Sequence, residues 1–330
     1  MSEFRLPSVS VVVPVFNNAE TLSELVSRLL VAKLPSSVAP TLEICLVDDG
    51  STDDSWTVMR ALRAQFPDAV TVVRLSRNFG QVGALLAGYR LVRGDAIMTI
   101  SADLQDDAAL LTELTDRWVA GADVVIANRA AREDSFRSLL ISRIAYGVAR
   151  RGYPKMPAGG FDCFLLSRRA MDVLNELPGN HRFLQGDVLW LGLPTVFVPY
   201  TRQKRPAGKS GWTLSKRTKY FVDLMIDATF LPIKFMSRIG ILVAIAGLLY
   251  AVVIVVLRLL GETPIPGWAP LMITGLLVGG VIMVMLGIIG EYVWRMNDEI
   301  RGRPPYLIAE VDGPRASVPP AGESGASVHR

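Results

Sequence analysis

The stretch SVSVVVPVF, residues 8–16, is a run of apolar, mostly β-branched residues. A helix-like segment begins at about Ala19, and a second strand-like run, LEICLVDDG, follows at residues 42–50. The alternation continues with helix-like segments at 54–66, 81–93 and 108–120 and strand-like segments at 71–76, 95–103 and 123–129. Short Val/Ile-rich runs that alternate with amphipathic helices are typical of a parallel sheet covered on both faces. We therefore expect an α/β, Rossmann-like fold with a mostly parallel sheet.

Ligands of such sheets bind at the carboxyl ends of the strands, so polar residues at those positions are candidates for a site. The first four strands are followed by Asn17 and Glu20, Asp48 and Asp49, Arg77 and Asn78, and Asp103 and Gln105. A dinucleotide-binding oxidoreductase would share the alternation of strands and helices. Such an enzyme needs a glycine-rich turn after its first strand, whereas this chain reads PVFNNAE at that point.

The fourth strand ends in the acidic stretch ISADLQDD, residues 100–107. Carboxylate and amide oxygens at a strand end suit a hard divalent cation such as Mg²⁺ or Mn²⁺, which would hold this negative charge together. Asp103 and Gln105 are two residues apart and can reach one ion together. For Asp106 and Asp107 we expect a plainer role, which is to cap the helix that follows.

Two apolar stretches near the C-terminus predict a membrane anchor. The mean hydropathy of +0.34 is high for a soluble protein, and charged residues make up only 20% of the chain. Residues 239–257 and 263–290 carry no charge, and each stretch can supply the roughly 20 apolar residues that cross a bilayer. We predict transmembrane helices at 236–260 and 268–292, joined as a hairpin.

Basic residues flank the outer ends of this hairpin: Lys234, Arg238, Arg295, Arg301 and Arg303, against Arg258 alone between the spans. The positive-inside rule then places both outer ends in the cytoplasm, in a multi-pass protein of the inner membrane without a secretory signal. The expected organisation is an N-terminal domain at 1–212, membrane-interface helices at 213–235, a cytoplasmic segment at 293–311 and a disordered tail at 312–330. Cys45 and Cys163 are expected to be reduced core thiols.

Several motifs in fixed order resemble the A-type glycosyltransferases of family two: VVVPVFNNAETL (11–22), LVDDGSTDDS (46–55), RNFGQVGALLAGY (77–89) and SADLQDD (101–107). The pattern R-x-x-R-x-x-G-x-S-x-W from Arg202 to Trp212, the two predicted spans and the segment 290–308 narrow the resemblance. They are similar to the polyprenyl-phosphate glycosyltransferases, the group that contains dolichol-phosphate mannose synthase, the bacterial undecaprenyl-phosphate glucosyltransferases and the aminoarabinose transferase ArnC. The resemblance covers about residues 8–311.

This resemblance implies a nucleotide-sugar donor, UDP-linked by preference. The residues that it places in the donor pocket are Pro14, Val15, Asn17, Asp48, Asp49, Arg77, Ser101, Ala102, Arg129 and Arg132. Within this set, Asp49 is expected to reach the edge of the base and Asp48 to support it. Asp103 and Gln105 would hold the Mg²⁺ or Mn²⁺ ion that neutralises charge on the departing nucleotide.

The resemblance also implies a polyprenyl phosphate acceptor of undecaprenyl type at the cytoplasmic membrane face. Its phosphate is assigned to Arg202, Arg205, Lys209 and Ser210, and the catalytic residues are Asp103, Asp162, Arg202 and Arg205. A phosphate monoester is mostly dianionic at neutral pH, so it can attack the anomeric carbon without a strong protein base. The implied reaction is a direct displacement with inversion. Relatives form homo-tetramers, so a homo-oligomer is expected, and no nucleic acid is expected among the partners.

Plainer roles stay open for some of these residues. Arg129 and Arg132 could form surface ion pairs with Glu133 or Asp134. Asp162 could be a strand-edge acid without a role. The basic run near the membrane could bind anionic lipid headgroups as well as, or in place of, an acceptor phosphate.

The chain also departs from the family pattern at several positions. Most relatives have Asp where this chain has Ser101, which predicts weaker metal binding. Gln185 and Gly186 stand where an Arg-Gly pair is common, and Gly211 and Trp212 stand where Lys-Tyr is frequent, which leaves the sugar and acceptor specificity open.

Two rival functions come from other classes. A processive polysaccharide synthase would need more spans and a Gln-x-x-Arg-Trp motif, whereas this chain reads QGDVLW at residues 185–190. A catalytically silent, nucleotide-sugar-binding membrane scaffold is the second alternative, motivated by Ser101. Turnover of a nucleotide sugar with polyprenyl phosphate discriminates the scaffold from the enzyme.

Overall fold

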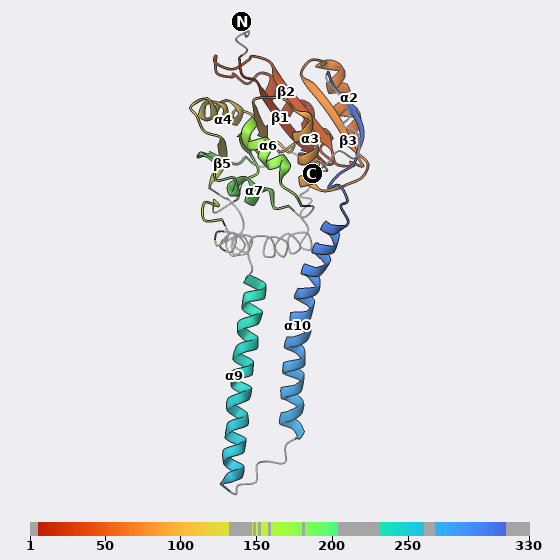
Figure 1. The fold of residues 1–330 in the computed structure, drawn as a ribbon. Helices are drawn as coiled ribbons and strands as arrows, with labels where there is room; N and C mark the ends of the chain where they lie inside the picture. Colours follow the sequence, from red (N-terminus) through yellow and green to blue (C-terminus); the bar gives the residue numbers. More distant parts are fainter. Residues whose placement is uncertain are drawn as a thin grey trace, which may run out of the picture. The chain divides into compact units, whose positions relative to one another are not determined.

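The computed structural model describes residues 6–131, 147, 150, 153–157, 160–179, 182–203, 231–260 and 268–314. The chain divides into two compact units (Figure 1). The first unit comprises Met1–Leu214 together with Pro304–Arg330, and the second comprises Ser215–Arg303. The C-terminal segment therefore returns to the unit that the N-terminal residues form.

An eight-stranded sheet in the order β7-β5-β6-β4-β1-β2-β3-β8 forms the centre of the first unit. Its strands are β1 (Val9–Val15), β2 (Leu42–Asp48), β3 (Val70–Leu75), β4 (Ala96–Thr99), β5 (Val124–Ala131), β6 (Phe164–Ser167), β7 (Thr195–Thr201) and β8 (Ile308–Asp312). β1 is parallel to β2 and β4, β2 is parallel to β3, and β5 is parallel to β7. β6 is antiparallel to β4 and β5, and β8 is antiparallel to β3. The predicted α/β class is confirmed, with a sheet that is mixed.

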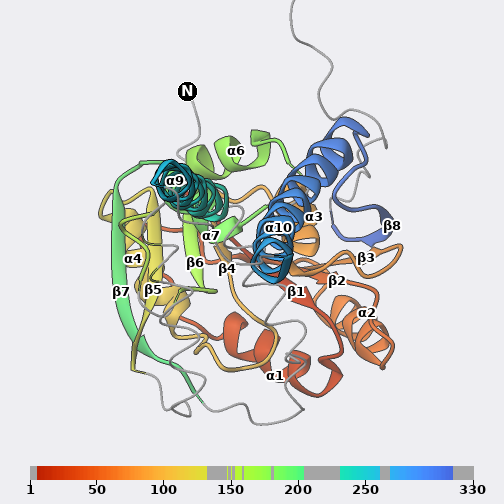
Figure 2. The ribbon, with the colours of Figure 1, turned by 90° about the horizontal axis from the view of Figure 1, so that it is seen from below.

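Helices cover both faces of this sheet. They are α1 (Ala19–Leu30), α2 (Ser55–Gln65), α3 (Gln81–Leu91), α4 (Leu110–Val119), α6 (Arg168–Glu176) and α7 (Leu184–Trp190). Helices α1 and α2 lie on one face, and α3 and α6 lie on the other (Figure 2). Leu22, Leu25 and Leu29 recur on the buried side of α1 and join the same core as Val11 and Val13 of β1. Burial on both faces explains why the central strands read as nearly continuous apolar runs.

The two cysteines confirm the expectation of core thiols, since Cys45 and Cys163 are both buried and form no disulfide. Burial raises the pKa of each thiol above its ordinary value, so neither is suited to act as a nucleophile.

Strand β8 was not predicted from the sequence. Asp312, which the sequence assigned to a disordered tail, is its last residue and pairs with Val72 of β3. Arg63 Nε lies 3.1 Å from Asp312 Oδ1, which ties α2 to the same strand. The segment before β8 passes over α3, where a Cβ on Gly83 would lie 3.1 Å from the carbonyl oxygen of Pro305. Residues 315–330 lie outside the described part of the chain.

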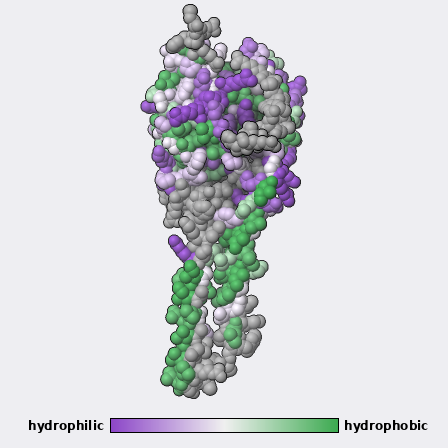
Figure 3. Space-filling model, viewed as in Figure 1, coloured by the Kyte–Doolittle hydropathy of each residue, from purple (hydrophilic) through white to green (hydrophobic). Residues whose placement is uncertain are grey.

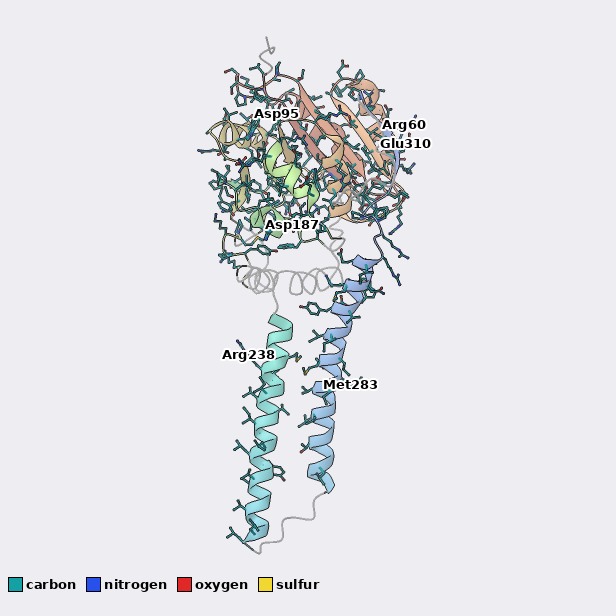
Figure 4. The ribbon with its side chains drawn as sticks, viewed as in Figure 1. Arg60, Asp95, Asp187, Arg238, Met283 and Glu310 are labelled. Carbon is teal, nitrogen blue, oxygen red and sulfur yellow. The ribbon has the colours of Figure 1, made fainter. Side chains whose placement is uncertain are left out.

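The second unit contains the helices α9 (Leu231–Leu259) and α10 (Trp268–Ile300). On the face that Figure 3 shows, apolar side chains make up most of the described surface of both helices, and Figure 4 marks Arg238 on α9 and the exposed Met283 on α10. Among the residues that the structure describes, one stretch, Leu277–Ile300, is long and apolar enough to cross a membrane. A second apolar stretch, Arg238–Tyr250, is shorter. The two-span hairpin thus stays a prediction, and most of the predicted interface segment, 213–230, lies outside the described residues.

Candidate active site

The loops that follow β1 and β2 are joined to each other by hydrogen bonds. The backbone N–H of Asn17 donates to Ser51 Oγ at 3.0 Å, and the N–H of Thr52 donates to Asn17 Oδ1 at 2.9 Å. Asn17 has a φ of 54°, in the left-handed region that asparagine adopts more readily than most residues. The N–H of Asn18 donates to Ser55 Oγ at 2.9 Å. The ends of the two strands therefore form one connected edge.

Asp49 fastens the loop after β3 to the end of β2. Its carboxylate oxygens accept hydrogen bonds from the backbone N–H groups of Phe79 at 2.7 Å and Gly80 at 3.0 Å. Burial raises the pKa of Asp49 to about 6, although these two hydrogen bonds oppose the shift. Gly50 allows the two loops to approach closely, because its φ is 71° and a Cβ there would lie 2.7 Å from the backbone nitrogen of Asn78.

The other predicted donor-pocket residues of this edge also lie near the strand ends. Asp48 is fully buried, and its Oδ1 accepts a hydrogen bond from the N–H of Ser51 at 3.0 Å, so it holds the loop that carries Asp49. Arg77 is exposed, with its guanidinium 4.1 Å from the centroid of the Phe79 ring. Val15 is buried and Pro14 is half-buried.

Three carboxylates and two guanidinium groups come together around the ends of β4, β5 and β7: Asp103, Asp106, Asp162, Arg129 and Arg202. Arg202 Nη2 lies 3.9 Å from Asp103 Oδ2 and 3.8 Å from Asp162 Oδ2. Arg202 Nε lies 3.8 Å from Asp106 Oδ1 and is buried without a hydrogen-bond partner among the described residues. We call these five residues the acidic cluster. It unites the predicted Asp103, Asp162 and Arg202, which are far apart in the sequence.

Arg129 and Asp162 form a close ion pair and hydrogen bond within the acidic cluster. The Arg129 side chain is only 4% exposed, whereas that of Asp162 is 33% exposed. Burial alone would lower the pKa of Arg129, but the attraction of Asp162 keeps this pKa above its ordinary value. Gln185 Nε2 lies 3.4 Å from Asp162 Oδ1 and donates to the carbonyl oxygen of Phe161 at 2.6 Å. The surface ion pair considered for Arg129 is therefore wrong.

The capping role that we expected for Asp106 is also wrong. Asp106 is 1% exposed, and its carboxylate accepts hydrogen bonds from Tyr200 Oη at 2.5 Å and Ser101 Oγ at 2.6 Å. Asp107 is the one that lies beside the helix, since its Oδ1 accepts the N–H of Ala109 at 3.0 Å just before α4 begins. Val198 and Tyr200 alternate with exposed residues along β7, which indicates that the Tyr200 side chain is buried. Because a buried tyrosine hydroxyl needs a hydrogen-bond partner, this alternation was the sequence signal for a contact with a group such as Asp106.

The turn that follows β4 presents the predicted metal ligands. Leu104 is buried and has a φ of 56°, so the chain reverses sharply between Asp103 and Gln105. Asp103 Oδ1 accepts a hydrogen bond from the Gln105 N–H at 3.2 Å and lies 3.1 Å from Ser101 Oγ, whose single hydroxyl hydrogen is donated to Asp106. The amide nitrogen of Gln105 faces the carbonyl oxygen of Gln203 at 3.4 Å, which leaves its amide oxygen at the other end of the group.

These donors fit a divalent cation that takes most of its ligands from elsewhere. Among the described residues, no three His, Cys, Asp or Glu side chains are arranged to hold an ion by themselves. Mg²⁺ in proteins is commonly bound by one or two side chains together with substrate phosphates and water. One carboxylate from Asp103 and one amide oxygen from Gln105 match that pattern.

The remaining predicted residues fall into two groups. Ala102 and Ser101 lie in the strand–turn segment beside Asp103, and the carbonyl oxygen of Ala102 accepts a hydrogen bond from Thr21 Oγ1 at 2.6 Å. Outside the described residues lie Arg132, Arg205, Lys209 and Ser210.

The geometry can therefore pair an incoming phosphate with Arg202 while Asp103 and Asp162 face the same space. The acidic cluster contains both signs of charge in one half-buried place, as sites that bind anions together with a cation do.

Comparison with known proteins gives a consistent result. Residues 10–174 match the sequence model of a protein family that is described as "Glycosyl transferase family 2". An uncharacterized glycosyltransferase of Synechocystis sp. is 33% identical over 92% of this chain and 96% of the relative. An undecaprenyl-phosphate 4-deoxy-4-formamido-L-arabinose transferase of Edwardsiella ictaluri is 32% identical over 94% of this chain and 96% of the relative. A bactoprenol glucosyl transferase of Shigella phage SfII is 31% identical over 91% of this chain and 97% of the relative.

Among solved structures, mannosyl-3-phosphoglycerate synthase from Rubrobacter xylanophilus is similar with a TM-score of 0.50 at 19% identity, over 70% of this chain and 75% of that chain. At this level of identity the likeness concerns the fold alone.

Proposed function

Because the chain belongs to glycosyl transferase family 2, we propose that it transfers a sugar from a nucleotide-sugar donor to the phosphate of a polyprenyl lipid. Two of the relatives are named for such an acceptor, bactoprenol in one and undecaprenyl phosphate in the other. The single observation that carries the proposal is the meeting of Arg202 with Asp103 and Asp162 at the carboxyl edge of the sheet. A UDP-linked donor is our preference, because the sequence resembles bacterial enzymes of the glucosyl and aminoarabinose type.

The acceptor phosphate is the nucleophile in this reaction. Its dianion carries no proton on the attacking oxygen, so a protein base is not required. One phosphate oxygen forms a bond to the anomeric carbon of the sugar while the bond from that carbon to the nucleoside diphosphate breaks, which inverts the anomeric centre. Arg202 pairs with the acceptor phosphate and sets its direction of attack, since guanidinium geometry matches two phosphate oxygens.

Asp162 and Arg129 have a positioning role in this proposal. Asp162 is 33% exposed and can therefore face the sugar or the acceptor, whereas Arg129 is buried and holds the carboxylate in one orientation. The loops that Asn17, Asp48 and Asp49 organise supply the surface for the nucleotide.

Asp103 and Gln105 are the residues that would hold Mg²⁺ or Mn²⁺. When bound, the ion supplies Lewis-acid assistance to the departure of the nucleoside diphosphate, an effect of several kcal/mol in general. Ser101, whose hydroxyl donates to Asp106 and lies 3.1 Å from Asp103 Oδ1, leaves this ion with one carboxylate fewer than most relatives would offer, so we expect a site of modest affinity.

The proposed location is the cytoplasmic membrane, with both outer ends of a two-helix hairpin in the cytoplasm. Support comes from the apolar stretch Leu277–Ile300 and from the basic residues on either side of the uncharged segments. A lipid acceptor would be delivered in that membrane.

The direct test is a donor screen with the full-length chain in detergent or in membranes. UDP- and GDP-sugars are supplied one at a time with undecaprenyl phosphate and Mn²⁺ or Mg²⁺, and the lipid fraction is examined by mass spectrometry. We expect one lipid-phosphate-linked sugar, inverted at its anomeric carbon, and loss of this product on chelation. A folded protein that binds a nucleotide sugar but yields no lipid product with any donor would favour the catalytically silent scaffold instead.

A further inference from the structure

We propose that Asp106 positions Arg202 for the acceptor phosphate by attracting its guanidinium without hydrogen-bonding to it. The inference rests on the proposed function, in which Arg202 binds that phosphate. Asp106 is thus a positioning residue in this scheme, and it has no direct contact with either substrate. Its neighbour Asp107, with the same side chain, has no such role.

Both carboxylate oxygens of Asp106 are already engaged. Oδ1 accepts the hydroxyl hydrogen bond of Tyr200 at 2.5 Å, and Oδ2 accepts that of Ser101 at 2.6 Å. The Tyr200 hydroxyl also lies within the electrostatic reach of Arg129. Because a positive charge repels the hydroxyl hydrogen, Arg129 favours the orientation in which Tyr200 donates to Asp106. The Asp106 side chain is therefore held in one place by two hydroxyl groups, one from β7 and one from the segment that follows β4.

Asp106 attracts the guanidinium of Arg202 electrostatically and does not form a hydrogen bond with it. Arg202 Nε lies 3.8 Å from Asp106 Oδ1, which is beyond hydrogen-bond distance but close enough for strong attraction in a half-buried place. Asp103 and Asp162 lie at similar distances, 3.9 and 3.8 Å, on Nη2. Arg202 makes no hydrogen bond to any described residue. Its donors are therefore available to an incoming anion.

Arg129 provides the internal contrast. Arg129 forms a direct hydrogen bond with Asp162, and its side chain is 4% exposed. It therefore cannot bind a ligand without breaking its pair with Asp162. Arg202 is 26% exposed and is centred between carboxylates, none of which it hydrogen-bonds. The hydroxyl bonds from Tyr200 and Ser101 account for the difference, because each takes one lone pair of an Asp106 oxygen and together they fix the carboxylate 3.8 Å from Arg202 Nε.

The same geometry separates Asp106 from the metal. Its side chain is fully buried, and each oxygen has a hydroxyl partner, whereas Asp103 is at the turn beside Gln105. Loss of the Asp106 charge is therefore expected to weaken acceptor binding and to leave the metal requirement alone. Loss of the Asp103 charge is expected to change the metal requirement.

The test compares Asp106→Asn with the matched control Asp107→Asn in the full-length protein. KM for undecaprenyl phosphate, KM for the nucleotide sugar and the half-saturating Mn²⁺ concentration are measured for each. Removing a charge 3.8 Å from Arg202 is expected to raise the acceptor KM about tenfold or more, with the other two values changed less than about threefold. Asp107→Asn is expected to resemble the wild type in all three values.

A binding measurement without turnover complements the kinetics. Titration of a short-chain polyprenyl phosphate into the detergent-solubilised protein without nucleotide is expected to show the same loss of affinity for Asp106→Asn. An unchanged acceptor affinity overturns the proposal, and a raised Mn²⁺ requirement shows that Asp106 is a metal ligand. If the wild type gives no lipid-linked product at all, the proposed function fails; if it does and Asp106→Asn matches it, only this inference fails.

Tyr200→Phe keeps the proposal testable if Asp106→Asn does not fold. This variant keeps the ring and the carboxylate but frees Asp106 Oδ1 to hydrogen-bond with Arg202, so the acceptor KM is expected to rise at an unchanged Mn²⁺ requirement. The double variant with Asp106→Asn is expected to be no worse than Asp106→Asn alone, because Tyr200 acts through Asp106. A wild-type acceptor KM in Tyr200→Phe, or fully additive losses in the double variant, would contradict the proposal.

Discussion

The Arg129–Asp162 pair predicts an asymmetry in stability that separates its two partners. Breaking a buried ion pair by removing one partner typically costs about 3–5 kcal/mol, because the other charge is left buried and uncompensated. Arg129 is 4% exposed, so Asp162→Asn leaves the positive charge of Arg129 buried without its partner. Asp106 remains within its electrostatic reach, which brings the expected cost to the lower end, about 3 kcal/mol.

The reverse substitution is expected to cost less. Arg129→Met removes the buried charge itself and keeps a long apolar side chain in its place. The stranded Asp162 is 33% exposed and still has Arg202 at 3.8 Å, so water and that guanidinium compensate it. We expect a loss of about 1 kcal/mol, in the range of partly exposed ion pairs.

Thermal unfolding of the two variants in detergent, without substrates or metal, measures this difference. For a domain of about 200 residues, 1 kcal/mol corresponds to roughly 2–4 °C, so Asp162→Asn is expected to melt about 4–8 °C below Arg129→Met. Asp172→Asn is a suitable control, because its partner Arg168 is 3.5 Å away in an exposed i,i+4 pair. Equal melting temperatures for the two variants, or a lower one for Arg129→Met, would refute the reasoning on burial.

Further predictions concern the metal and the donor. Asp103→Ala is expected to abolish product formation in the lipid assay while Asp107→Ala changes it little, and equal losses would show that the metal lies elsewhere. Ser101→Asp is expected to lower the Mn²⁺ concentration needed for half-maximal turnover, because it adds a carboxylate beside the cluster, and an unchanged requirement would count against Ser101 lying near the ion. For Asp49, whose pKa is raised to about 6 chiefly by burial, protonation below that pH removes one of the two acceptors of backbone N–H groups. KM for the nucleotide-sugar donor is therefore expected to rise as the pH falls from 7 to 5, with the midpoint of the rise at about pH 6. A KM that does not change over this pH range would contradict the role of Asp49.

The fold class could be predicted because its signal is local. Runs such as residues 8–16 and 42–50 must be apolar on both faces to lie at the centre of a covered sheet, and each run shows this in its own composition. The direction of β6 could not be predicted in the same way. Its residues are all buried, and burial does not reveal whether the strand runs with or against its neighbours.

Strand β8 shows a different limit. All five of its residues are half-buried or exposed, and it joins the edge of the sheet through backbone hydrogen bonds to β3. Such pairing needs no particular side chain, so the composition of residues 308–312 carried no strand signal. The predicted tail began at 312 because residues 312–330 are rich in Pro, Gly, Ser and Ala.

The site residues also divide into those that local sequence could indicate and those that depend on distant contacts. Asp48, Asp49 and Asp103 were placed by the strand-end rule, which is a property of the topology and holds wherever strands are found, whereas Asp162 was placed by the family resemblance. The role of Asp106 depends on Tyr200, 94 residues later in the chain, and nothing in ISADLQDD indicates that contact. Two adjacent aspartates after an apolar run look alike in sequence whether they cap a helix or enter a core.

Leu104 decides which of those aspartates turns inward. A buried leucine with a φ of 56° is strained, and such a conformation persists only when its surroundings hold it. Here the surroundings are the core contacts of Leu104 and the bond from the Gln105 N–H to Asp103 Oδ1. With an ordinary extended backbone at Leu104, the residues that follow would point elsewhere, and Asp106 would not reach Tyr200. The acidic cluster is therefore a consequence of tertiary packing that selects a locally unfavourable turn, which is why local sequence rules gave Asp106 the role of a helix cap.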